Sequence, residues 1–272
     1  MSQTFADRKP VVDWLTVVAI AAIAISFTVA FHEGVHAITC LAVGGNLQEY
    51  SALYASCDNS TVLQVRIVAG SAPTFNLIVG TLLWIILRNL RKQTPETWLF
   101  LWLLMLMNWF YGAGYFIFSG VSNIGDWAIV IAGWKASWLW RVLMTIVGLL
   151  LYVLFVRLVF QELGRMIGGK SGELILRAKK ICTLCYVTSF VVILMAGFFC
   201  PYGPLGLPVL AGLTAVLGTL SPLMWMMRWF HTKYFQKPDR EPLEIHRKWH
   251  WIVTSAIAMF MYTFITGRTL YF

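Results

Sequence analysis

The segment His32-Glu33-Gly34-Val35-His36 is the part of this sequence with the clearest chemical potential. Residues four apart on a helix share a face, so His32 and His36 can bind one zinc ion from the same side. Glu33 would then act as a base toward a water molecule at that ion. The spacing predicts a zinc site of the hydrolytic kind.

A catalytic zinc site needs a third protein ligand and one open position. Asp126 is the only acidic residue between Glu96 and Glu162, and it lies in a glycine-rich connection after the third apolar run. By the order of the apolar runs, this connection and the end of the first run lie on the same side of the membrane. We therefore predict Asp126 as the third ligand. The alternative is that Asp126 caps a helix that begins at Trp127.

The elements that must hold these residues are membrane-spanning helices. Of the 272 residues 59% are hydrophobic and only 12% are charged, about half the charged fraction of an ordinary soluble domain. Ionisable side chains at membrane depth are costly unless they have partners or a function. The composition excludes a soluble enzyme and favours an integral, multi-pass membrane protein.

Apolar runs long enough to cross a bilayer predict an all-α polytopic fold with about seven helices. The expected spans are residues 12–43, 67–87, 97–119, 137–160, 181–200, 207–230 and 250–267. After the first span, β-branched and aromatic residues surround the turn-forming sequence Asp58-Asn59-Ser60, which predicts a small hairpin or loop. We expect residues 1–136 to form the catalytic core and residues 137–272 to add helices of unknown role.

The 21 lysine and arginine residues predict the orientation of these spans. Four of them lie in the connections on one side, which leaves 17 of the 21 on the side of the N-terminus; the four are Arg66, Lys135, Arg141 and Arg268. Cytoplasmic connections carry the excess of basic residues in membrane proteins. We therefore predict a cytoplasmic N-terminus, and the net charge of +9 needs no nucleic-acid partner.

The five cysteines do not suggest a disulfide framework, because most of them lie in or beside apolar runs. They are expected to be small core residues. Cys182 and Cys185 form a CxxC pair, but no second pair completes a metal site.

Three separated stretches resemble the site-2 protease-like intramembrane zinc metalloproteases, peptidase family M50. Residues 32–37 with the later Gly44-Gly45 are similar to that family's HExxH-A segment ending in glycines. Residues 69–76, AGSAPTFN, are similar to its A-G-P-x-x-N segment. Asn108 with residues 120–126, GVSNIGD, resembles a divergent form of its N-x-x-P-x-x-x-x-D-G motif. Displaced or missing prolines, and Trp127 in place of glycine, are departures from the family pattern, so the chain resembles a divergent member.

This resemblance covers residues 12–136 and implies a three-helix core that hydrolyses peptide bonds in or near transmembrane segments of membrane-protein substrates. It implies Zn²⁺ as the cofactor, bound by His32, His36 and Asp126, with Glu33 as the catalytic base. Side-chain amides are the expected oxyanion or substrate contacts: Asn76, Asn108 and Asn123. No insert between the spans is long enough for a PDZ domain.

Other interpretations stay open at this point. A metal-binding regulatory membrane protein without catalytic activity, or a polar cluster that joins helices, would use the same residues. A CAAX-type zinc protease would need a downstream glutamate ligand, Glu162 or Glu173. A diiron lipid hydroxylase would need more histidines than the five present. His246 and His250 stand among basic residues and are expected at the membrane interface.

Overall fold

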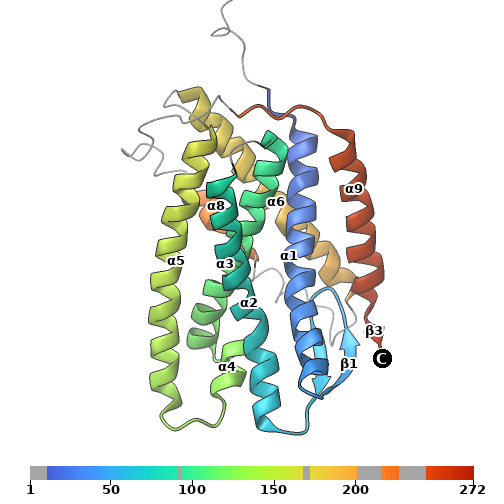
Figure 1. The fold of residues 1–272 in the computed structure, drawn as a ribbon, viewed down its shortest axis with the longest axis vertical. Helices are drawn as coiled ribbons and strands as arrows, with labels where there is room; N and C mark the ends of the chain where they lie inside the picture. Colours follow the sequence, from blue (N-terminus) through green and yellow to red (C-terminus); the bar gives the residue numbers. More distant parts are fainter. Residues whose placement is uncertain (1–10, 91–92, 168–171, 201–215, 227–242) are drawn as a thin grey trace, which may run out of the picture.

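A computed structural model describes residues 11–90, 93–167, 172–200, 216–226 and 243–272 of the chain. The protein is mostly helical, and its long helices run beside one another along the longest axis (Figure 1). Together with the apolar composition, this architecture confirms the prediction of a multi-pass helical membrane protein.

Six helical segments within the described residues are long and apolar enough to cross a membrane. They are α1 (Trp14–Ala42), α2 (Val62–Asn89), α3 (Pro95–Ser122), α5 (Ser137–Ile167), α6 (Gly172–Phe199) and the segment Trp249–Arg268. The last of these consists of α9 (Trp249–Phe260), a π-helical turn (Met261–Ile265) and a 3₁₀ turn (Thr266–Arg268).

Seven spans were expected, and the sixth of them, residues 207–230, is described only over residues 216–226. A short apolar helical segment, Val216–Trp225, lies there and includes α8 (Pro222–Trp225). The rest of that predicted span lies outside the described residues.

Local capping sets where several helices begin. The side chain of Asp13 accepts a hydrogen bond of 3.0 Å from the Thr16 amide at the start of α1. Thr61 and Gln64 form a reciprocal capping box at the start of α2. This box explains why α2 begins at Val62, five residues before the predicted start at residue 67, since capping extends the helix beyond its apolar run.

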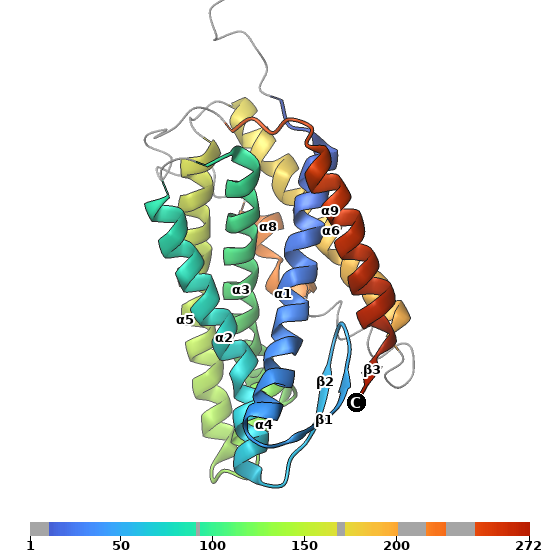
Figure 2. The ribbon, with the colours of Figure 1, turned by 45° about the vertical axis from the view of Figure 1, so that its right-hand side comes forward.

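A small antiparallel hairpin follows α1, as predicted. Its strands are β1 (Asn46–Tyr50) and β2 (Ala55–Asp58), and Tyr50 pairs with Ala55. A third strand, β3 (Leu270–Tyr271), pairs with the other side of β1, which gives the order β2-β1-β3. Figure 2 shows this sheet beside the second half of α1, below the end of α9. Strand β2 is therefore an edge strand of the described sheet.

Cys40 and Cys57 form a disulfide, with 6.0 Å between their Cα atoms. The expectation that the cysteines would be unpaired core residues is wrong for these two. The hairpin folds back against the end of α1, which brings Cys57 of β2 to Cys40 of α1. The prediction holds for Cys182, Cys185 and Cys200, which are free and buried.

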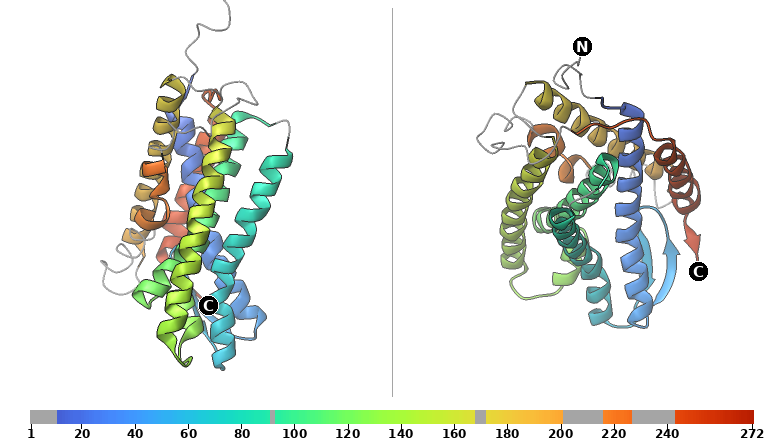
Figure 3. Two further views of the ribbon diagram at one scale, coloured as in Figure 1. Left: turned by 90° about the vertical axis from the view of Figure 1, so that its left-hand side faces the viewer. Right: turned by 45° about the horizontal axis from the view of Figure 1, so that its top comes forward.

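The packing of α3 against both α2 and α5 forms much of the interior (Figure 3). Gly112 permits the close approach of α2 and α3, because a Cβ atom there would lie 2.6 Å from Leu77 Cγ and 3.1 Å from the Pro73 carbonyl oxygen. On the other side of α3, the Trp109 ring stacks on Phe155 of α5 at a centroid distance of 4.5 Å. The division of the chain at residue 136 stays a prediction.

Candidate metal centre

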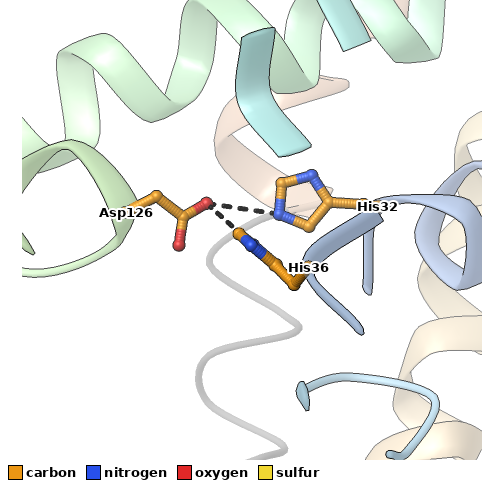
Figure 4. A group of neighbouring side chains, drawn as sticks. All are labelled: His32, His36 and Asp126. Atoms are coloured by element: carbon orange, nitrogen blue, oxygen red, sulfur yellow. Dashed lines mark ion pairs between the residues drawn. The ribbon is translucent and has the colours of Figure 1, made fainter. Parts of the chain in front are cut away.

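The structure brings His32, His36 and Asp126 together at one end of the helical bundle. Nε2 of His32 lies 3.3 Å, and Nε2 of His36 lies 3.4 Å, from the same Asp126 carboxylate oxygen, Oδ2 (Figure 4). One ligand atom from each residue fits within 4.8 Å of the others. Both histidines are almost fully buried, and the Asp126 side chain is 15% exposed. The predicted ligand set therefore converges on one point.

The other ring nitrogen of each histidine is already occupied. Nδ1 of His36 lies 2.8 Å from the Val68 carbonyl oxygen, which can only accept a hydrogen bond, so this Nδ1 carries a proton. Nδ1 of His32 lies 2.6 Å from Oδ1 of Asn76. In a neutral imidazole, a protonated Nδ1 leaves Nε2 as a bare lone pair. Both Nε2 atoms are thus set up as metal ligands.

The buried polar atoms at the centre lack partners of their own. His32 Nε2 and Asp126 Oδ2 are both buried without a hydrogen bond among the described residues. Two imidazole lone pairs that face a carboxylate oxygen repel one another unless a cation lies among them. Imidazole and carboxylate together form a ligand set that zinc favours. This chemistry fits a divalent transition metal, with zinc as the natural candidate.

Asp126 reaches the two histidines from the short helix α4 (Asp126–Ile131). The cap position before α4 is Gly125, at φ +93°, and no side chain caps this helix. Asp126 is therefore not the helix cap that was considered as its alternative role. Gly125 permits the turn that aims the Asp126 carboxylate at α1, since a positive φ strains residues with a side chain.

Two arginines fix the connection on either side of Asp126. Arg141 donates hydrogen bonds of 3.0 and 2.7 Å to the carbonyl oxygens of Gly120 and Val121 at the end of α3. Arg66 donates one of 2.8 Å to the carbonyl oxygen of Ala132, directly after α4. Both arginines belong to the small set of basic residues predicted on this side of the membrane.

The surroundings of Asp126 keep its carboxyl group ionised. Burial alone would raise its pKa, but without a metal the two histidines, when protonated at Nε2, lower the pKa to about 2. An ionised carboxylate is the form that binds a metal.

Glu33 lies beside this centre and is 7% exposed. Its carboxylate lies within electrostatic reach of the Ala55 backbone in β2, and both residues line the same cavity, so the hairpin borders the predicted base. Glu33, His36 and Asp126 line one cavity of about 970 Å³. The predicted base and two of the three predicted ligands thus share a space that a substrate and water could enter.

The rest of the cavity wall is mainly apolar and comes from the hairpin, α2, α3, α5 and the region around Gly218. Leu53, Ile117, Phe118, Val121 and Ile124 are among its lining residues. Strand β2 contributes Ala55 and Cys57, so its edge borders the cavity.

The three asparagines predicted as oxyanion or substrate contacts lie elsewhere. Asn76 donates through Nδ2 to Asn108 Oδ1 at 2.8 Å, and Asn108 donates to the Leu104 carbonyl oxygen at 2.8 Å. Asn123 ends α3 in the left-handed conformation, at φ 58°. The residues that line the cavity within the described chain include none of the three. Asn76 instead orients His32, and Asn108 orients Asn76.

Sequence analysis did not identify the Val68 carbonyl, the Ala55 backbone or Tyr115 as parts of this site. The Tyr115 ring stacks on His32 at a centroid distance of 4.8 Å and an interplanar angle of 20°. No local motif marks these groups, because each reaches the site through packing between separate elements.

The remaining titratable candidates lie away from this centre. Glu162 forms ion pairs with Arg165 at 3.2 Å and with Arg88 at 3.9 Å, near the opposite end of the bundle. His246 pairs with Glu244 at 3.4 Å, and both side chains are exposed. The side chain of Glu173 and the whole of His231 lie outside the described part of the chain.

Comparison of this chain with protein-family models, with curated proteins and with solved structures gives no match.

Proposed function

We propose that this protein is an intramembrane zinc metalloprotease of the site-2 protease type, which hydrolyses peptide bonds in or near transmembrane segments. One observation carries the proposal. Two imidazole nitrogens and a carboxylate oxygen converge beside a buried glutamate. Among the described residues, the His32 nitrogen and the Asp126 oxygen are buried without a hydrogen-bond partner. A purely structural polar cluster would pair these atoms and would have no use for the extra carboxylate.

His32, His36 and Asp126 would hold the zinc ion. When bound, zinc supplies Lewis-acid activation of a water molecule and of the scissile carbonyl. Glu33 takes the proton as the water oxygen attacks the carbonyl carbon, and later gives it to the departing amine. Glu33 lines the cavity beside Ala55 of β2, where it can do both.

Substrates would be membrane-protein segments that enter in an extended form. A helical segment protects its carbonyl groups with internal hydrogen bonds, so it must unwind before hydrolysis. The mainly apolar wall accepts apolar side chains, and the edge of β2 offers backbone partners to a strand lying beside it. Segments with local glycine, proline or asparagine should be cleaved preferentially, because these residues open a helix most easily.

The disulfide supports an orientation in which this site opens on the outer side of the membrane. Disulfides persist in oxidising compartments and are rare in the cytosol. Cys40 lies one helical turn after His36 on α1, and Cys57 lines the same cavity as Glu33 and Asp126, so the disulfide lies beside the metal centre. The distribution of basic residues independently predicts the same orientation of the spans, with the N-terminus in the cytoplasm and the site on the outer side.

The decisive experiment measures proteolysis by the purified protein in lipid nanodiscs, using a panel of transmembrane-segment substrates of known sequence. Glu33→Gln should abolish cleavage and retain the metal, because an amide cannot accept the proton. Asp58→Asn is the matched control, since Asp58 is exposed at the end of β2. Cleavage at the wild-type rate by Glu33→Gln would refute the proposal.

Metal analysis of the same preparations tests the cofactor. One zinc ion per chain is expected in the wild type, and Asp126→Ala should lower this content sharply. If the wild type binds zinc and cleaves no substrate in the panel, the result would instead support the alternative that this is a metal-binding regulatory protein without catalytic activity. Unchanged zinc content in Asp126→Ala would remove Asp126 from the ligand set.

A further inference from the structure

Amide hydrolysis builds negative charge on the oxygen of the scissile carbonyl, and a hydrogen-bond donor at that oxygen accelerates the reaction. This step rests on the proposed function: a protein that hydrolyses peptide bonds needs a residue that supplies this donor. The asparagines expected from the sequence do not line the cavity, and two of them, Asn76 and Asn108, form a chain that ends on His32. A different donor is needed.

Tyr115 is the side chain best placed to supply it. It lies on α3 and lines the same cavity as Glu33, His36 and Asp126. Its ring lies nearly parallel to the His32 imidazole, at a centroid distance of 4.8 Å. This stacking fixes the plane of the phenol ring against His32.

The hydroxyl of Tyr115 lies within electrostatic reach of both carboxylates at the site, Asp126 and Glu33. Within the residues that the structure describes, the Tyr115 hydroxyl has no hydrogen-bond partner. A phenol that lines a cavity and lacks a protein partner is free to donate to a ligand in that cavity.

The neighbouring Tyr111 has the burial and contacts of a packing residue and serves as a comparison for Tyr115. Tyr111 stands one helical turn before Tyr115 on α3, is 3% exposed and does not line the cavity. Its ring meets the His32 ring edge-on, at a centroid distance of 6.3 Å. The two tyrosines share a helix and a neighbour, and they differ in access to the cavity.

We propose that Tyr115 is a catalytic residue whose hydroxyl donates a hydrogen bond to the scissile carbonyl oxygen as it becomes an oxyanion. When the water oxygen bonds to the carbonyl carbon, the π electron pair moves onto the carbonyl oxygen and the proton from water goes to Glu33. The pair returns when the C–N bond breaks, and Glu33 then protonates the amine. The phenol keeps its proton throughout, so the step balances without another reactant.

Tyr115→Phe tests the proposal, because phenylalanine keeps the ring that stacks on His32 and removes only the hydroxyl. In nanodiscs, kcat should fall about 100-fold, which is the usual effect of losing one oxyanion donor. KM and zinc content should stay unchanged. Tyr111→Phe is the matched control and should keep kcat within about twofold, since it removes a hydroxyl outside the cavity.

A binding measurement separates the oxyanion role from effects on substrate binding. A phosphinic peptide with apolar flanking residues mimics the tetrahedral anion, and Tyr115→Phe should weaken its binding by about the same factor as kcat. The uncleaved peptide should bind equally well to Glu33→Gln and to the double variant Glu33→Gln/Tyr115→Phe. Equal weakening of both ligands would overturn the proposal, because it would mean that Tyr115 acts on ground-state binding.

Other outcomes also decide the matter. Wild-type kcat in Tyr115→Phe would overturn this inference and leave the proposed protease intact, provided that Glu33→Gln is inactive. Loss of zinc from Tyr115→Phe would also overturn it, since the phenol would then be a metal ligand or a structural support. Failure of the wild type to cleave any substrate would overturn the proposed function itself.

Discussion

Asn76 on α2 contacts His32 on α1 at 2.6 Å, through the ring nitrogen that faces away from the metal position. This contact fixes the tautomer of His32, because Oδ1 of Asn76 can only accept a hydrogen bond. The Nδ2 group of Asn76 in turn donates to Asn108, which holds the amide in that orientation. An imidazole oriented in this way is a stronger ligand than one that can rotate.

Replacing Asn76 should therefore weaken the metal site without touching a ligand. Asn76→Leu should lower zinc affinity by about 10- to 100-fold, as the loss of such supporting contacts usually does. Competition with a chelator measures this affinity. Asn89→Leu on the same helix is the control, because Asn89 is exposed and bonds only to the Ile85 carbonyl oxygen. Equal affinity in the two variants would contradict the role of Asn76.

The Cys40–Cys57 disulfide should stabilise the hairpin that borders Glu33. Closing a loop of this length contributes about 3 kcal/mol in the chain-entropy account. Replacing both cysteines by serine should lower the thermal unfolding temperature and reduce activity, since β2 would no longer be tied to α1. Reductant should reproduce the effect in the wild type and add nothing in the double variant. An additional loss in the double variant would point to another reducible group.

The orientation can be tested with single cysteines at the two ends of the bundle. Ser60→Cys, beside the hairpin, should react with a membrane-impermeant maleimide added to intact cells, because it is exposed at the metal end. His246→Cys, exposed at the opposite end, should react only after the membrane is opened. The reverse labelling pattern would place the site on the cytoplasmic side.

The start of α1 should carry a pH-dependent contribution to stability. Burial alone would raise the pKa of Asp13, but hydrogen bonds from Arg247 and Thr16 lower it below its ordinary value of 3.8. Because the folded-state pKa is the lower one, the ionised carboxylate stabilises the fold above pH 3.8. This contribution is lost as the pH falls through the lowered folded-state pKa.

Asp13→Asn should consequently lower the stability of the protein near neutral pH by about 1 kcal/mol. The difference from the wild type should shrink as the pH falls below 3.8 and through the lowered folded-state pKa, because below that pKa both proteins are uncharged at this position. Thermal unfolding of both proteins in detergent, from neutral pH to below pH 4, measures this difference in stability. A difference that stays constant with pH would show that the charge of Asp13 contributes nothing.

Helical periodicity and the order of the crossings were enough to predict the centre of the site. The i, i+4 spacing of His32 and His36 fixes a shared face, and the number of crossings before Asp126 fixes its side of the membrane. The hairpin was also predictable, from its turn residues. Helical spacing, turn residues and the order of the crossings can be read from the sequence without knowing how the helices pack against one another.

Other features depend on how distant segments pack, and the sequence alone could not predict them. The contact between Asn76 and His32 depends on the rotation of α2 against α1, which no local pattern reports. Tyr115 is one of many aromatic residues, and only its stacking on His32 distinguishes it. The disulfide forms because the hairpin folds back onto α1. The capping box of Thr61 and Gln64 was visible in the sequence and could have corrected the start of α2.

The pairing of β3 with β1 sets the order in which the protein is assembled. The hairpin is synthesised early, but its neighbouring strand comes from residues 270–271, and the Ala52 amide bonds to the Thr266 carbonyl oxygen. The three-stranded sheet is therefore completed only after the turns that follow α9 have been synthesised. A nascent chain therefore contains His32, His36 and Asp126 well before the third strand of this sheet is available.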